Sequence, residues 1–311
     1  MIDFIYFSLT GKCNLNCAFC YASPSCQNTR EFSFNEIVEF LRVFSINGGK
    51  GVQFTGGEIF LRDDILEILS RAVNFGLQVN IITNGTLLTE KPINFIKNNR
   101  IDITVSIDGP QEIHDVFRGM SGAYKKTMDC ISEFNKRGIH FSLQTMVFPS
   151  QFEKQLVWLE AFAKNSLHKY TRITDVAPEG KGARCNQLLW PYENLKAIPE
   201  AANALTRRAN YHKIFFTNII SRKEMEYYYP GFENVLKPWI MPDGYIYPFL
   251  THNKNWRLGS INEYPNLCSS VLQRFNDVCR LAYKKALTKQ CFSLFNIIAE
   301  TSREVPESVK T

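Results

Sequence analysis

The feature that most constrains the fold is a regular alternation of β-rich and helical segments between residues 4 and 177. Ser33 and Glu36 form a capping box before one helix, and Gly76 and Gly138 stand where two other helices should end. Such a series predicts parallel strands joined by helical crossovers, as an open sheet or a partial barrel. The strands are rich in Ile, Val, Phe and Thr, as buried strands are, and they are expected at residues 4–9, 51–54, 78–83, 101–107, 140–147 and 170–176.

The alternation of β-rich and helical segments ends at about residue 195. Residues 195–210 and 267–298 have mainly helical patterns, and a turn at residues 241–244 predicts a β-hairpin. We therefore expect two domains, an α/β domain at residues 1–195 and a small α+β extension at residues 196–311.

Composition narrows the class of protein. The chain has 311 residues and a formal net charge of +6, without a basic block interleaved with aromatic residues, so we expect no nucleic-acid partner. No apolar run is long enough to span a bilayer, so no membrane partner is expected. Residues 1–5 lack the pattern of a signal peptide, which predicts a cytoplasmic protein. The positive charge would suit an anionic substrate or an acidic peptide, although such an excess is more often a solvated surface.

Three of the nine cysteines lie within eight residues, directly after the first predicted strand. Cys13, Cys17 and Cys20 have the spacing C-x3-C-x2-C, and tight clustering of this kind indicates a metal. Three thiolates could each bind one iron of a four-iron cube and leave the fourth iron open. A zinc site with Cys26 or a distant histidine as fourth ligand, or three thiols without metal, are the alternatives.

Glycines and polar residues follow the next three strands. In parallel sheets with helical crossovers, loops at the carboxyl ends of the strands form the ligand site. Paired glycines let the backbone approach a ligand closely, and a carboxylate there can receive an ammonium group. The residues are Gly56, Gly57 and Glu58 after the second strand, Asn84 after the third, and Ser106 and Asp108 at the end of the fourth.

These motifs resemble the radical S-adenosylmethionine (SAM) superfamily, whose hallmark is this cysteine spacing after the first strand. The resemblance implies a partial (β/α)6 barrel and one [4Fe–4S] cluster held by Cys13, Cys17 and Cys20. SAM would chelate the open iron, and its reductive cleavage would give a 5′-deoxyadenosyl radical that abstracts hydrogen from a substrate. The implied SAM-binding residues are Phe19 beside the adenine, Gly56, Gly57 and Glu58 at the methionine amino group, and Asn84, Ser106 and Asp108 near the ribose or carboxylate.

Two further segments carry weaker resemblances. Residues 114–119 match a stretch of peptide and small-molecule maturases, in which Arg118 would suit a structural ion pair. Residues 239–248 and 258–261 resemble the SPASM or Twitch extension, but Phe249 stands where that extension has a cysteine. We therefore predict a degenerate extension without auxiliary clusters, in which Cys268, Cys279 and Cys291 are small buried side chains on helical faces.

The resemblance implies a radical SAM enzyme, and maturation of a ribosomally synthesised peptide is the expected function. Only twelve residues precede Cys13, which leaves no room for an N-terminal peptide-recognition domain. Modification of a small molecule, such as a nucleotide, sugar or cofactor precursor, is therefore the alternative. A non-catalytic zinc or iron–sulfur protein is the alternative of another class. An electron donor such as flavodoxin or ferredoxin is the implied partner.

Overall fold

The chain is described by a computed structural model. It describes residues 2–21, 31–163, 166, 168–191, 194–209, 214–216, 219–221, 237–248, 257–261, 268–286 and 291–293. The expectations for Cys26 and Phe249 lie outside the described residues. Among the helices that the described ranges contain, none is both long enough and apolar enough to cross a bilayer.

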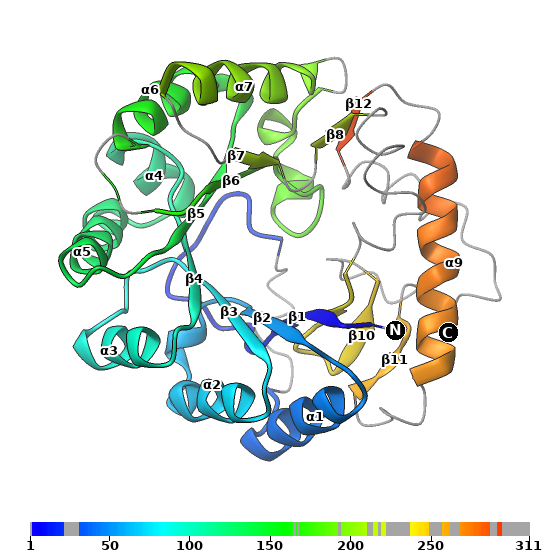
Figure 1. Ribbon diagram of the computed structural model, residues 1–311. Coiled ribbons are helices and arrows are strands. Elements are labelled where there is room, and N and C mark those ends of the chain that lie inside the picture. The colour runs from blue at the N-terminus through cyan, green and yellow to red at the C-terminus, as the bar shows by residue number, and fades with distance from the viewer. Residues whose placement is uncertain are drawn as a thin grey trace.

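A curved, mainly parallel sheet forms the centre of the molecule (Figure 1). Seven parallel strands follow one another in chain order: β1 (Phe4–Ser8), β2 (Gly51–Thr55), β3 (Gln78–Thr83), β4 (Asp102–Ser106), β5 (Ser142–Met146), β6 (Thr171–Thr174) and β7 (Ile214–Phe216). At the other side of β1 the sheet continues through β9 (Trp239–Ile240), β10 (Tyr245–Tyr247) and β11 (Gly259–Ser260). A separate pair joins β8 (Ile219–Ser221) to β12 (Cys291–Ser293). The expected α/β fold, a partial parallel barrel, is confirmed.

Helices cover the outer face of this sheet (Figure 1). The capping box of Ser33 and Glu36 is present at the start of α1, and Gly76 and Gly138 adopt positive φ just after α2 and α5. The helices are α1 (Phe34–Ile46), α2 (Ile65–Asn74), α3 (Glu90–Asn98), α4 (Gln111–Arg118), α5 (Ala123–Lys136), α6 (Phe152–Ala163), α7 (Ala197–Ala209) and α9 (Cys268–Ala286).

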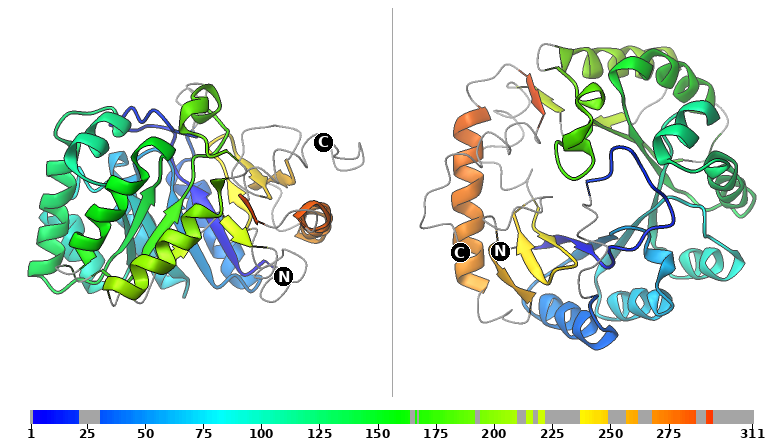
Figure 2. Two further views of the ribbon diagram at one scale, coloured as in Figure 1. Left: turned by 90° about the horizontal axis from the view of Figure 1, so that it is seen from above. Right: turned by 180° about the vertical axis from the view of Figure 1, so that it is seen from behind.

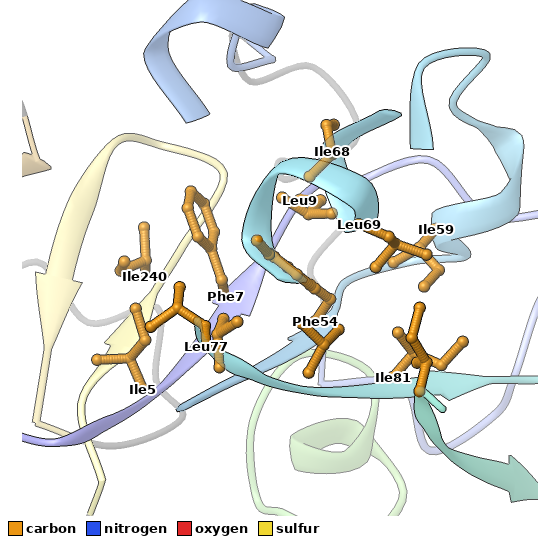
Figure 3. Close-up of a cluster of buried hydrophobic side chains, with 14 of the residues drawn as sticks. Ile5, Phe7, Leu9, Phe54, Ile59, Ile68, Leu69, Leu77, Ile81 and Ile240 are labelled. Atoms are coloured by element: carbon orange, nitrogen blue, oxygen red, sulfur yellow. The ribbon is translucent and has the colours of Figure 1, made fainter. Parts of the chain in front are cut away.

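The main core lies between the sheet and these helices. Figure 3 shows Phe7 of β1 and Phe54 of β2 facing Ile68 and Leu69 of α2, and all four side chains are fully buried. Side chains of a strand alternate between its two faces, so the residues between these apolar positions point to the inner face of the sheet. That face is therefore lined by another set of residues, many of them polar.

The region after residue 195 departs from expectation in two places. The predicted hairpin is present as β9 and β10, but β9 pairs in parallel with β1, so the hairpin extends the main sheet. The expected helix of residues 267–298 ends at Ala286, and Cys291 lies on β12 instead of a helical face, which corrects that expectation. Cys279 is fully buried within α9, as expected. The domain boundary at residue 195 stays a prediction.

Candidate cofactor site

The loop that carries Cys13, Cys17 and Cys20 follows β1 directly and curves inside the ring of sheet and helices (Figure 2, right). We call residues 9–21 the cysteine loop. All three cysteines are partly exposed, whereas Leu9 and Leu15 of the same loop are buried. The loop is thus anchored by apolar side chains while its three cysteines are only partly buried.

The Gly56–Gly57 turn after β2 holds the first half of this loop. The Gly57 amide donates to the Thr10 carbonyl at 2.8 Å, and the Glu58 amide donates to the Lys12 carbonyl at 2.8 Å. A Cβ atom on Gly57 would lie 2.0 Å from the Lys12 carbonyl oxygen, so any larger residue would push the two segments apart. The two glycines were predicted to let the backbone approach a ligand, and their lack of a side chain also leaves room for the backbone of the cysteine loop.

Two other elements hold the second half of the loop. From the end of α4, the carbonyls of Phe117 and Arg118 accept from the amides of Ala18 and Asn16 at 2.9 and 3.1 Å. From the loop after β6, the Lys181 amide donates to the Cys20 carbonyl at 2.8 Å. The cysteine loop is therefore held by backbone bonds from three neighbouring segments, which fixes its conformation for a ligand.

The three thiols have the number and the spacing along the chain that a four-iron cluster requires. Burial, which is the largest cause, and the charges of Cys17 and Cys20 raise the pKa of Cys13 to about 11. Bound cations deprotonate coordinating thiols despite such a pKa. The described residues contain no group of three or more side chains arranged to hold one metal ion. A four-iron cube binds each thiolate through a different iron, so these residues fit it.

Glu58 is fully buried and links the second and third strands. Its carboxylate accepts from the Asn84 amide at 2.8 Å, the Thr83 hydroxyl at 2.9 Å and the Phe60 amide at 3.2 Å. Burial raises the pKa of Glu58, although these hydrogen bonds oppose the shift. The carboxylate therefore fixes the relative position of two loops, a role that sequence reasoning did not assign to it.

Asp108 and Arg118 form a buried ion pair beneath the cysteine loop. Both Asp108 oxygens accept from the Arg118 guanidinium, at 2.6 and 2.9 Å, and one also accepts from the Met146 amide at 3.0 Å. Arg118 also donates to the Cys17 sulfur, and its charge opposes the rise that burial causes in the pKa of Cys17. The structural ion pair of Arg118 is present, and the Asp108 oxygens predicted to approach SAM are already bound.

The other predicted residues surround the same loop. Phe19 is 8% exposed, and the Arg118 guanidinium lies 5.0 Å from the centre of its ring. Asn84 donates to the Asn14 side-chain oxygen at 2.9 Å, which joins the end of β3 to the cysteine loop. Ser106 is buried at the end of β4. All ten predicted site residues thus belong to the cysteine loop or to the carboxyl ends of β2 to β4.

Sequence reasoning missed Gln155, a fully buried residue of α6. Its amide nitrogen donates to the carbonyls of Asp108 and Met146, at 2.5 and 2.7 Å, and its oxygen accepts from the Phe148 amide at 3.0 Å. A single glutamine on a helix carries no motif. Only the three-dimensional arrangement shows that the Gln155 side chain satisfies backbone groups of Asp108, Met146 and Phe148 next to the ion pair.

Comparison with known proteins identifies the family. Residues 7–163, about half of the chain, match the Radical SAM superfamily, so this chain belongs to that superfamily, whose members are enzymes. Members of this family use a [4Fe–4S] cluster and SAM.

Individual relatives are similar over parts of the chain. The AdoMet-dependent heme synthase of Methanosarcina barkeri is 32% identical over 187 residues, which are 59% of this chain and 53% of the relative. The subtilosin biosynthesis protein AlbA of Bacillus subtilis is 28% identical over 198 residues, 60% of this chain and 44% of the relative. The chain thus spans about half the length of the curated relatives that it matches.

The crystal structure of Streptococcus suis SuiB bound to its precursor peptide SuiA has a TM-score of 0.66 at 15% identity, over 80% of this chain and 59% of SuiB. SuiB has also been solved with SAM, at a TM-score of 0.65 and 17% identity, over 80% of this chain and 60% of SuiB. At this identity the likeness concerns the fold. It confirms the partial barrel.

Proposed function

We propose that this enzyme modifies a peptide by radical SAM chemistry, with Cys13, Cys17 and Cys20 as the protein ligands of its [4Fe–4S] cluster. The observation that carries the assignment is the cysteine loop, which is held by backbone bonds at the carboxyl ends of parallel strands and whose three cysteines are partly exposed. When bound and reduced, the cluster and SAM supply a 5′-deoxyadenosyl radical. The chain's own residues position these groups and shield them from water.

The peptide assignment rests on the relatives. AlbA takes part in the biosynthesis of the bacteriocin subtilosin, SkfB is a maturation protein of a sporulation killing factor, and SuiB binds a precursor peptide. The heme synthase match favours a second candidate, a small-molecule substrate. The net charge of +6 is compatible with an acidic peptide and with an anionic small molecule.

We assign the SAM contacts to Phe19, the Gly56–Gly57 backbone, Asn84 and Ser106, all at the rim beside the cysteine loop. Glu58 and Asp108 act chiefly through their neighbours, because their carboxylate oxygens already accept hydrogen bonds from Thr83, Asn84 and Arg118. A flavodoxin or ferredoxin is the proposed electron donor.

Anaerobic reconstitution tests the cluster assignment. The protein should bind about four irons and four sulfides per chain, and each of the three cysteine-to-alanine variants should lose them. With SAM and a strong reductant it should release 5′-deoxyadenosine. Protein that stays iron-free and releases none would overturn the proposal.

Isotope transfer tests the substrate class. Candidate peptides and candidate small molecules, each deuterated, are incubated with the reconstituted enzyme, and deuterium in 5′-deoxyadenosine is measured by mass spectrometry. Transfer from a peptide supports the proposal. Transfer only from a small molecule establishes the second candidate in its place.

A further inference from the structure

The inner face of the sheet, opposite the helices, carries a group of polar and aromatic side chains below the cysteine loop. Strand register places Tyr6 of β1 beside Gln53 of β2 and Trp239 of β9, and places Gln144 of β5 beside Arg172 of β6. Each of these residues lies between buried neighbours that face the opposite side, so alternation directs all five to the inner face. We call these five residues the inner-face group.

The two glutamines of this group lack partners for buried polar atoms. Gln53 is 3% exposed, and its side-chain nitrogen has no hydrogen-bond partner. The side-chain oxygen of Gln144 is likewise buried without a partner. Buried amide groups are nearly always hydrogen-bonded in folded proteins, so a donor and an acceptor left unpaired on the inner face indicate a ligand that completes them.

Arg172 supplies the charge of the inner-face group. Among the described residues no ion pair of Arg172 is found, and its guanidinium lies 6.0 Å from the ring centre of Tyr170. Burial raises the pKa of Tyr6, and the positive charge of Arg172 opposes that rise. The carboxylates of Glu58 and Asp108 are bound to other groups. The cation is therefore available to an anionic ligand.

The two aromatic residues form one wall of this region. Tyr6 and Trp239 stack face to face, with ring centres 4.6 Å apart and planes 3° apart. Their pairing depends on the parallel contact of β9 with β1, so the C-terminal segment contributes directly to the inner face. An aromatic wall beside unpaired amides suits a ligand with both apolar and polar parts.

We propose that the inner-face group is a substrate subsite for an acidic residue of a peptide. Arg172 binds the side-chain carboxylate, while the amides of Gln53 and Gln144 bind a carbonyl and an N–H of the adjacent peptide backbone. A peptide group offers both an acceptor and a donor, which matches the unpaired atoms of the two glutamines. Arginine binds carboxylates through two parallel hydrogen bonds, which gives selectivity over a neutral amide. The inference rests on the proposed peptide-modifying function and names the type of residue that the enzyme prefers in its substrate peptide.

The test compares two matched tripeptides, acetyl-Ala-Glu-Ala-amide and acetyl-Ala-Gln-Ala-amide, by calorimetric titration of the reconstituted enzyme with SAM present. The native enzyme should bind the glutamate peptide about tenfold more tightly or better. Arg172→Gln should abolish that preference and Arg172→Lys should retain part of it. Gln53→Leu should weaken both peptides alike. The control Arg71→Gln, at a half-exposed position of α2, should bind as the native enzyme does.

Three results would overturn the subsite. In the first, the native enzyme binds neither peptide. In the second, Arg172→Gln folds normally by circular dichroism but keeps the preference for the glutamate peptide. In the third, Arg172→Gln loses affinity for SAM without any change in peptide binding. Release of 5′-deoxyadenosine without peptide is measured in parallel. If that release fails while the glutamate preference and its loss in Arg172→Gln are observed, the proposed function fails and the subsite stands.

Discussion

Separating Asp108 from Arg118 is expected to destabilise the folded protein strongly. Asp108 is fully buried and Arg118 is 8% exposed, so water cannot replace a lost partner. Removing one member of a buried, hydrogen-bonded ion pair typically costs about 3–5 kcal/mol. Asp108→Asn leaves a buried guanidinium without its counter-charge, and Arg118→Met leaves a buried carboxylate without its donors. Each change alone should lower the free energy of unfolding by about 4 kcal/mol.

The double variant distinguishes an ion pair from two independent contributions. With both charges removed, the sum of the single losses should exceed the loss in the double variant by about 3 kcal/mol. Urea unfolding of the cluster-free protein, followed by far-ultraviolet circular dichroism, measures all four free energies. The exposed pair Lys125 and Asp129 is the control, with an expected coupling below about 0.5 kcal/mol. Additive losses at Asp108 and Arg118, to within about 0.5 kcal/mol, would refute the reasoning.

Three other measurements follow from the geometry. Gly119→Ala should lower iron incorporation, because its Cβ would lie 2.4 Å from the Asn16 carbonyl, whereas Gly138→Ala, at a similar positive φ with nothing within 4 Å, should not. Burial lowers the pKa of His114 from 6.5 to about 4. Its contribution to stability is complete above pH 6.5 and falls by about 3 kcal/mol as the pH drops to 4, so His114→Gln should flatten the pH profile of urea unfolding in that range. Cys17→Ala should lose the iron and Cys279→Ala should keep it, as iron analysis of the reconstituted proteins will show.

Much of the fold follows from local sequence patterns. The six β-rich segments correspond to β1 to β6 within two residues at each end, because each combines apolar alternation with clear turn signals. The seventh parallel strand, β7, was missed because three residues are too few for a periodic pattern. The parallel pairing of β9 with β1 joins residues far apart in the chain, and no local signal encodes that contact.

The candidate site was predictable where motifs exist. Spacing identified Cys13, Cys17 and Cys20, and position after a strand identified Glu58. The contact of Arg118 with the Cys17 sulfur could not be foreseen, because it requires the end of α4 to lie beneath the cysteine loop. Residues that act through backbone contacts, such as Gln155 and the glycines beside the loop, become recognisable only in three dimensions.

The pairing of β9 with β1 has a consequence for synthesis on the ribosome. Tyr6 and Phe7 leave the ribosome early, but their partners Trp239 and Ile240 follow only after most of the chain has been made. Until then, one side of the strand that leads into the iron-binding segment exposes unpaired amide and carbonyl groups. An unpaired strand edge of this kind can pair with strands of other nascent chains. We therefore expect slow translation or early release to favour aggregation that starts at this strand.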